Sequence, residues 1–257
     1  MKTKTLGFIG GGRITRILLQ AFQNENVSFD KIVVFDTNPE PATNLQKQFP
    51  SIEISGLDQA SYQDIVVIAL HPPVIMEMLE KIQLLMSVET TLISLAPKIT
   101  IEKILGKLVN VTRILRLIPN ATSIINEGFN PVSFSPGIEA VDKQSLLQML
   151  EALGQTFEVP ESQLEAYAVI SAMAPTYFWF QWKKLCDIGE KIGLEKEASE
   201  QAVSATMNAA LNTMFNSGLN WNEVSDLIPV KPIGEYEEEI MNMYEHKLVG
   251  LYNKISP

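Results

Sequence analysis

The sequence predicts an α/β fold, in which an N-terminal doubly wound parallel sheet is followed by an all-α C-terminal domain. From residue 5 to about residue 160, short runs rich in β-branched residues alternate with helix-length amphipathic stretches, the pattern of βαβ units. Beyond that point helical periodicity continues without a strand candidate. We therefore expect one domain over residues 1–160 and a helical domain over residues 161–257.

The expected strands are short and largely apolar. The run Ile65–Leu70 is apolar at every position, which is typical of a central strand covered by helices on both faces. Six strands are expected in total: Thr5–Ile9, Lys31–Phe35, Ile65–Leu70, Thr91–Leu95, Arg113–Leu117 and Thr156–Val159.

The C-terminal domain is expected to contain four helices, near residues 162–172, 175–192, 195–216 and 234–254. Ser162 and Glu165 have the spacing of a helix capping box, and Gly193 and Gly218 are placed to end helices. One helix carries a stripe of small side chains against which another helix can pack closely, from the same chain or from a second subunit. The stripe consists of Ala198, Ala202, Ala205 and Ala209.

Composition argues against several classes of partner and location. The formal charge is -10, and the scattered lysines and arginines form no basic stripe for nucleic acid. No apolar run is long enough to span a membrane, and the N-terminus leaves no room for a signal peptide. The single cysteine, Cys186, has no disulfide partner in the chain and no metal-ligand spacing around it. We expect a cytoplasmic protein without a metal site.

A glycine-rich turn follows the first expected strand. Gly10 and Gly12 occupy the first two glycine positions of the G-x-G-x-x-G fingerprint, and the next residues open a helix. Gly10 permits the tight turn, and Gly12 lets the backbone approach a pyrophosphate at the positive end of the helix. Thr15 stands where a third glycine or an alanine is usual. The motif predicts a Rossmann-type domain that binds NAD or NADP, with contacts from Gly10, Gly11, Gly12, Arg13 and Ile14.

An acidic residue ends the second expected strand. Asp36 lies about 20 residues beyond the fingerprint, where a carboxylate accepts hydrogen bonds from the ribose hydroxyls of NAD. No lysine or arginine accompanies it, although Thr37 and Asn38 can hydrogen-bond a 2′-phosphate. An aspartate before Asn-Pro is also a common start of a turn. Asp36, Thr37 and Asn38 are therefore candidate cofactor ligands, and the choice between NAD and NADP stays open.

Four segments resemble the pyrroline-5-carboxylate reductase family in order and spacing, across essentially the whole chain. They are Gly7–Gly12, Leu70–Pro73, Arg116–Asn120 followed by Asn126-Glu127-Gly128, and Ser171–Tyr177. The resemblance implies an NAD(P)H-dependent oxidoreductase that transfers hydride to a cyclic imine, converting pyrroline-5-carboxylate to proline. It also implies a helical C-terminal domain that serves the substrate site and dimerisation, in a homodimer or a higher homo-oligomer.

The resemblance also implies roles for individual residues. Asn120 would lie near the nicotinamide and orient the reacting ring, with a simple turn cap after Pro119 as the alternative. The loop at Leu70, His71 and Pro72 would close over the cofactor, and Ala96 would contact it after the next strand.

The candidate catalytic residues are Asn120 and two possible proton donors, His71 and Tyr177. An unperturbed histidine titrates at about pH 6.5, so His71 could protonate an amine as hydride arrives. The alternative for His71 is a polar residue that faces solvent at a strand end. Tyr177 matches a tyrosine of the family's helix-opening segment.

The chain departs from the family where substrate should bind. The family's Lys-Pro-Gln is His71-Pro72-Pro73 here, its Ala-Ala-Gly is Leu95-Ala96-Pro97, and a Gly-Ser-Gly is Ala172-Met173-Ala174. The family's Ser-Pro-Gly-Gly-Thr-Thr segment is absent near residues 228–233. Two alternatives therefore stay open: a dinucleotide-binding sensor or interaction protein that has lost catalysis, and a reductase of a different imine or a keto acid.

Overall fold

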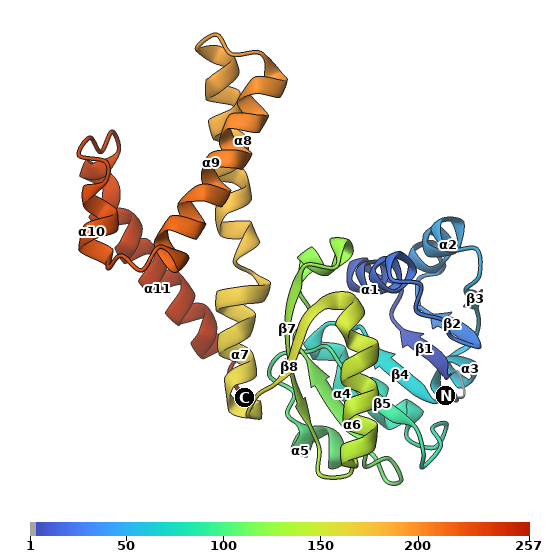
Figure 1. Cartoon of the computed structure of the whole chain (residues 1–257). Helices are drawn as coiled ribbons and strands as arrows, with labels where there is room; N and C mark the ends of the chain where they lie inside the picture. The colour runs from blue at the N-terminus through green and yellow to red at the C-terminus, as the bar shows by residue number, and fades with distance from the viewer. Residues whose placement is uncertain (1–3) are drawn as a thin grey trace. The chain divides into compact units, whose positions relative to one another are not determined.

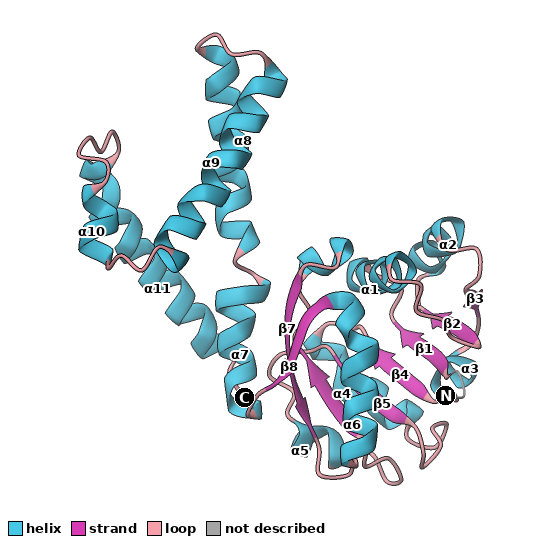
Figure 2. Ribbon diagram, in the orientation of Figure 1, coloured by secondary structure: helices cyan, strands magenta, loops and turns pink. Residues whose placement is uncertain are grey.

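The computed structural model describes residues 4–257, which form two compact units (Figures 1 and 2). The first unit contains the chain up to Met173 together with Leu251–Pro257, and the second contains Ala174–Gly250. The chain therefore passes between the units twice. Residues 161–173, which the sequence assigns to the helical domain, belong to the first unit.

The first unit is built on an eight-stranded sheet in the order β3-β2-β1-β4-β5-β6-β7-β8. Neighbouring strands are parallel, except that β7 runs antiparallel to β6. Strand β1 lies between β2 and β4, so the strand order reverses direction there. The strands are β1 (Thr5–Ile9), β2 (Lys31–Phe35), β3 (Glu53–Ile54), β4 (Ile65–Ile68), β5 (Thr91–Ser94), β6 (Ile114–Leu117), β7 (Gly128–Phe134) and β8 (Gly154–Glu158).

Helices cover both faces of the sheet and bury two apolar clusters. The side chains of β4 alternate between the clusters, with Val67 in one and Val66 and Ile68 in the other. This alternation confirms that the all-apolar run marks a strand buried on both faces. Helices α1 (Arg13–Asn24), α2 (Pro39–Gln48) and α6 (Ala140–Leu150) cover one face. Helices α4 (Pro72–Ile82) and α5 (Ile101–Leu105) cover the other, and the short α3 (Leu57–Ser61) packs beside β1.

The six expected strands are confirmed, two with the expected bounds and four with ends shifted by one or two residues, and two further strands are present. Strand β3 is a two-residue strand at the sheet edge. Strand β7 contains Pro131 and lacks an alternating pattern, and a proline within a run argues against a strand. Pro131 still takes part in the sheet, because its carbonyl oxygen accepts from the Ile118 N–H over 3.1 Å.

The capping box expected at Ser162 and Glu165 is wrong. The segment begins with a 3₁₀ turn, η3 (Glu161–Gln163), and continues through α7 (Leu164–Tyr167) into a wide π turn, η4 (Ala168–Ala172). No side chain caps η3. Glu165 is instead buried against Arg116, because a buried guanidinium requires a carboxylate partner. Leu164 and Ala168 pack with Ile118, which attaches this segment to the first unit.

The second unit is entirely helical. It contains α8 (Pro175–Lys191), α9 (Lys196–Asn216), α10 (Trp221–Asp226), the 3₁₀ turn η5 (Gly234–Tyr236) and most of α11 (Glu237–Ile255). The expected helices here are confirmed, and α10 is an addition. Gly193 and Gly218 have φ values of 109° and 80° and follow the ends of α8 and α9, as expected of glycines that stop helices.

In residues 4–257 no helix is both long and apolar enough to cross a membrane.

Gly7 is the point of closest approach between β1 and α3. A Cβ atom there would lie 1.9 Å from the Ala60 carbonyl oxygen, which is backbone and cannot swing aside. We expect Gly7→Ala to lower the free energy of unfolding by roughly 1–3 kcal/mol, measured by urea titration with circular dichroism. The control is Gly106→Ala, whose Cβ would come no closer than 3.4 Å to other atoms. Equal unfolding midpoints for the two variants would contradict this packing.

Candidate functional site

Most candidate residues lie at one edge of the sheet, where the carboxyl ends of its parallel strands meet. Gly10–Gly12 follow β1, Asp36–Asn38 follow β2, Leu70–Pro72 follow β4, Ala96 follows β5 and Asn120 follows β6. Loops that leave neighbouring parallel strands at a reversal of strand order border a ligand crevice. Segments far apart in the sequence thus converge on this edge.

The two outer glycines of the turn have different reasons to be glycine. Gly10 has a φ of +109°, and a Cβ atom there would lie 2.5 Å from the Ala69 carbonyl oxygen, so the fold itself requires glycine. Gly12 has an ordinary φ of -80°, and a Cβ atom would meet nothing within 4 Å. The fold does not require glycine at position 12, and open space lies directly before α1.

The N-terminus of α1 is suited to an anion. Gly12 is its N-cap, and no side chain caps the first turn, so the first N–H groups remain available to a ligand. Arg13 is exposed at the first helical position, and Ile14 is half-buried against the core. Thr15 is buried, and its hydroxyl donates to the Gly10 carbonyl oxygen over 2.6 Å, which ties the helix to the turn. The open space and the free N–H groups fit the pyrophosphate of a dinucleotide.

Asp36 closes the turn after β2. Its Oδ2 accepts from the Gly11 N–H over 2.7 Å, and its Oδ1 accepts from the Asn38 N–H over 2.9 Å. Asn38 in turn caps α2, because its Oδ1 accepts from the Glu40 N–H. Thr37 and Asn38 are exposed, and Asp36 is half-buried. The structure therefore shows the turn-forming role of Asp36, and its contact with a ribose stays a prediction.

His71 faces solvent at the same edge of the sheet. It is the N-cap residue of α4, its side chain does not cap the helix, and Pro72 occupies the first helical position. Leu70 lies against the glycine turn, with its Cδ2 3.2 Å from the position of a Cβ at Gly10. An exposed ring at this edge of the sheet is compatible with either sequence-based interpretation of His71.

The side chain of Asn120 is engaged at both ends. Its Oδ1 accepts from the N–H of Thr122 over 3.1 Å and from the Thr122 hydroxyl, which caps the 3₁₀ helix η1 (Ala121–Ile125). Its Nδ2 donates to the carbonyl oxygen and the hydroxyl of Ser171, each over 3.3 Å. The capping role considered as an alternative is thus present, and the contact with nicotinamide stays a prediction.

Tyr177 belongs to the second unit, on the first turn of α8. Its ring meets the ring of Tyr244 edge-on, with 6.1 Å between centroids. Burial raises the pKa of the Tyr177 phenol above its usual value, and the neighbouring Tyr244 raises that pKa further. The phenol is therefore neutral near pH 7 and has a proton to donate.

A buried charge cluster beside the edge was not foreseen from the sequence. Arg116 on β6 is fully buried, and it bonds Glu161 over 2.8 Å, Glu165 over 2.6 Å and the Ala96 carbonyl oxygen over 3.2 Å. The available signal was the arginine itself, because it stands inside the apolar run Ile114–Ile118. Its two carboxylate partners lie more than forty residues along the chain, which spacing alone does not reveal.

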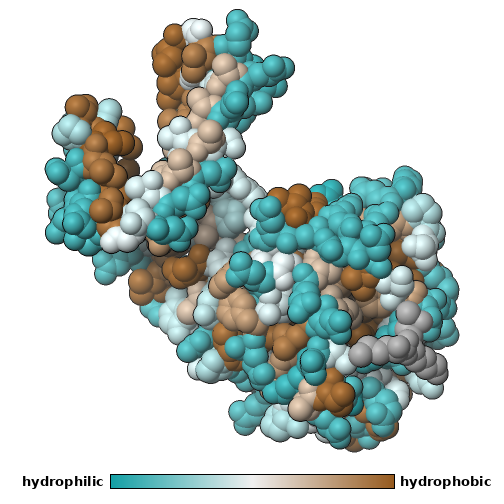
Figure 3. All heavy atoms as spheres, viewed as in Figure 1, coloured by the Kyte–Doolittle hydropathy of each residue, from teal (hydrophilic) through white to brown (hydrophobic). Residues whose placement is uncertain are grey.

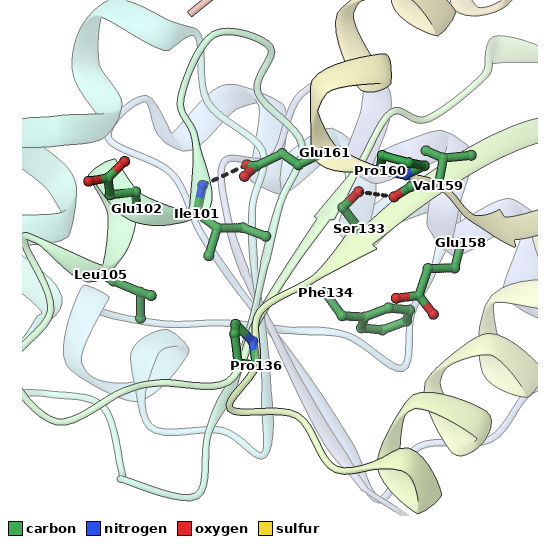
Figure 4. Close-up of a pocket in the computed structure, with 10 residues that line it drawn as sticks. All are labelled: Ile101, Glu102, Leu105, Ser133, Phe134, Pro136, Glu158, Val159, Pro160 and Glu161. Atoms are coloured by element: carbon green, nitrogen blue, oxygen red, sulfur yellow. Dashed lines mark hydrogen bonds between the residues drawn. The ribbon is translucent and has the colours of Figure 1, made fainter.

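A cavity of about 620 Å³ lies between α5 and the ends of β7 and β8 (Figure 4). Glu161 lines it and also accepts from the Ile101 N–H over 2.7 Å, the contact drawn as a dashed line. The other lining residues include Glu102, Phe134 and Glu158. None of the candidate cofactor residues lines this cavity, so it is separate from the glycine turn.

Within residues 4–257 there is no cluster of three or more His, Cys, Asp or Glu side chains placed to hold a metal ion.

Comparisons with known proteins agree with the motifs. Residues 5–98 match the family model described as NADP oxidoreductase coenzyme F420-dependent. The chain is 26% identical to the pyrroline-5-carboxylate reductase of Mycobacterium leprae over 207 residues, which cover 79% of this chain and 70% of the relative. It is 23% identical to the pyrroline-5-carboxylate reductase of Corynebacterium melassecola over 252 residues, or 96% of this chain and 93% of the relative.

The fold has the same likeness. A crystal structure of pyrroline carboxylate reductase from Plasmodium falciparum, with NADP bound, matches with a TM-score of 0.79 and 21% identity, over 99% of this chain and 96% of that one. The α/β fold with its helical C-terminal part is thereby confirmed. The resemblance indicated by the motifs is confirmed as well.

Proposed function

We propose that this chain, a divergent relative of the pyrroline-5-carboxylate reductases, is an NAD(P)H-dependent reductase that acts on the C=N bond of pyrroline-5-carboxylate to form proline. The observation that carries the cofactor half of the proposal is the open space at Gly12, because the fold gives no other reason for glycine there. The names of the relatives support the substrate half. The NADP in the Plasmodium falciparum structure supports a nicotinamide cofactor.

Each part of the edge has a defined task in this reaction. NADH or NADPH, when bound, supplies a hydride to the imine carbon. The first N–H groups of α1 bind the pyrophosphate, with Arg13 beside them. Asp36, Thr37 and Asn38 face the adenosine ribose, and Leu70, Pro72 and Ala96 border the other half of the crevice. Asn120 holds the loop after β6 in place for the ring.

The imine nitrogen must gain a proton as its carbon gains hydride. We propose His71 as the proton donor, because it is exposed at the carboxyl end of β4, beside the glycine turn. Tyr177 is the second candidate, since its phenol carries a proton near pH 7, although the raised pKa makes it a weaker acid than an exposed tyrosine. A side chain positioned for such a transfer contributes about 10²- to 10⁴-fold to rate.

A reductase of a different imine or of a keto acid is the second candidate function. It is favoured by the segment that replaces the family's Ser-Pro-Gly-Gly-Thr-Thr. There, Ile228, Val230 and Ile233 are exposed apolar residues in place of hydroxyl-bearing and glycine residues. A substrate pocket rebuilt with apolar side chains would select a less polar compound.

We further propose that the second unit joins two copies of the chain in a homodimer. In residues 174–250, all of which the structure describes, no apolar side chain is buried, although α9 alone is 21 residues long. Large apolar side chains are exposed on these helices instead, including Trp179, Phe180, Leu211 and Phe215. Figure 3 shows apolar surface along them. Helices of this length need a packed face for stability, and a second copy supplies it.

A cytoplasmic location is also proposed, because the one cysteine, Cys186, is a free thiol, as is usual in a reducing compartment.

The function is tested by the oxidation of NADH and NADPH with pyrroline-5-carboxylate, with a panel of other imines and keto acids, and with cofactor binding measured separately. We expect turnover of pyrroline-5-carboxylate with at least one cofactor. Turnover of another substrate alone would favour the second candidate function. Tight cofactor binding without any turnover would support a sensor that has lost catalysis.

Gly12→Asp tests the cofactor site itself. The new carboxylate enters the open space before α1 and repels the pyrophosphate, so the cofactor Kd should rise by about a hundredfold or more. The fold should be unaffected, since a Cβ there meets nothing within 4 Å. Gly12→Ala is the matched control for the added Cβ without the charge. Cofactor affinity that survives in Gly12→Asp would refute the site.

His71→Ala tests the proton donor. We expect kcat to fall by about 10²-fold or more, with a much smaller change in cofactor Kd. The control is His246→Ala, which removes an exposed histidine of α11. Tyr177→Phe is measured beside them. Unchanged kcat in His71→Ala, with a loss in Tyr177→Phe, would transfer the role to the phenol.

Leu211→Glu tests the dimer. A charge in the exposed apolar face of α9 should convert the dimer to monomer in sedimentation velocity, because a buried unpaired charge opposes association. Gln144→Glu adds the same charge to an exposed position of α6 and should leave the dimer intact. A wild-type chain that sediments as a monomer would rule the proposal out.

A further inference from the structure

The Ala96–Lys98 segment, which follows β5, is held by both members of one buried ion pair. The guanidinium Nη2 of Arg116 donates to the Ala96 carbonyl oxygen over 3.2 Å. Oε1 of Glu165 accepts from the Lys98 N–H over 2.9 Å, and the same oxygen accepts from Arg116 Nη2 over 2.6 Å. The Ala96 carbonyl and the Lys98 N–H are thus bonded to Arg116 and Glu165, and these two side chains are bonded to each other.

The conformation of this segment needs such support. Lys98 has a φ of +71°, a left-handed backbone that residues other than glycine rarely adopt. Its ammonium group donates to the carbonyl oxygen of Lys254, in the C-terminal stretch of the same unit, over 3.3 Å. Backbone in a sparsely populated conformation persists only where its surroundings hold it there.

Stability alone is a poor reason for this ion pair. Arg116 and Glu165 are almost completely buried, and burying two charges costs about as much free energy as their attraction returns. The pair is also incompletely satisfied, since Arg116 Nε and Glu165 Oε2 are buried without a hydrogen-bond partner. Well-packed apolar side chains are often equally stable in such places. The role that remains for the pair is to fix the backbone geometry of Ala96–Lys98.

The segment lies where that geometry matters. A dinucleotide lies across the point where the strand order reverses, with one half of the sheet serving each nucleotide. Asp36, after β2, faces the adenosine half, so the loops after β4, β5 and β6 border the nicotinamide half. Ala96 follows β5, the middle strand of these three.

We infer that Arg116 and Glu165 are positioning residues that hold the Ala96–Lys98 backbone as the wall of the nicotinamide half of the crevice. The inference rests on the proposed function, because it requires a nicotinamide cofactor. It assigns neither residue a contact with the reacting atoms. Loss of the pair should therefore disturb the nicotinamide half and leave the adenosine half intact.

The test is the double variant Arg116→Met/Glu165→Leu, which replaces the pair by apolar side chains of similar size. Glu161 loses its bond to Arg116, but its side chain is partly exposed to water and keeps the bond from the Ile101 N–H. Its Kd for NADH or NADPH should rise about tenfold, since both backbone bonds of the segment are lost. Its Kd for ADP-ribose, which lacks the nicotinamide, should match that of wild type. If NADPH is the preferred cofactor, the matching probe is ADP-ribose that carries a 2′-phosphate on its adenosine ribose.

Two further variants separate positioning from general damage. Glu165→Gln retains an oxygen that can accept from both Arg116 and the Lys98 N–H, so it should restore most of the NADH affinity. The control is Arg113→Met/Asp142→Leu, which removes a partly buried ion pair just before the amino end of β6. It should leave the affinities for NADH and for ADP-ribose unchanged.

Each outcome decides the question. Equal weakening of NADH and ADP-ribose binding would mean a merely structural role, and unchanged NADH binding would mean no role. Both overturn the inference while the proposed function stands. If the wild-type chain binds neither cofactor, the proposed function fails and the inference falls with it.

A measurement on the wild-type chain covers the case in which the double variant does not fold. Hydrogen exchange of the Lys98 N–H should be slowed by about a hundredfold or more against an unprotected amide, because the buried carboxylate holds it. Exchange at the unprotected rate would overturn the inference.

Discussion

The parallel pairing of β1 with both β2 and β4 is the constraint on which the rest of the first unit depends. It directs the loops after five strands to one edge, and it places the start of α1 at the point where the strand order reverses. Gly7 lets α3 pack against β1, and Gly10 lets the turn after β1 pass the end of β4, because backbone oxygens of Ala60 and Ala69 occupy the space a side chain would need. The open space before α1 is a by-product of that geometry, and it is what a pyrophosphate requires.

The first unit extends beyond the last strand of its sheet because charge holds the following segment. Arg116 brings a charge into the interior, and Glu161 and Glu165 reach it from η3 and α7. The chain immediately after these carboxylates, through Ser171, then supports Asn120. One buried guanidinium thus connects the loop after β5, the loop after β6 and the segment that leads into the second unit.

The second unit, in contrast, has well-defined helices but no apolar core of its own in residues 174–250. Its helices are long, regular and correctly bounded by glycines, yet they bury no apolar side chain of their own in residues 174–250. Local signals specify where such helices begin and end, because capping and helical propensity act within a few residues. They say nothing about what covers the apolar faces.

The sequence by itself determined the central strands, the glycine turn and the helices of the second unit, because hydrophobic periodicity and backbone conformation are local properties. It also placed Asp36 and His71 at strand ends. Only the tertiary structure decided that β7 is a strand despite Pro131, since its bonds come from β6 and β8. Likewise, only the tertiary structure decided that Glu165 binds Arg116 and does not form a local capping box. Pairing a buried guanidinium contributes more free energy than a hydrogen bond to an exposed N–H.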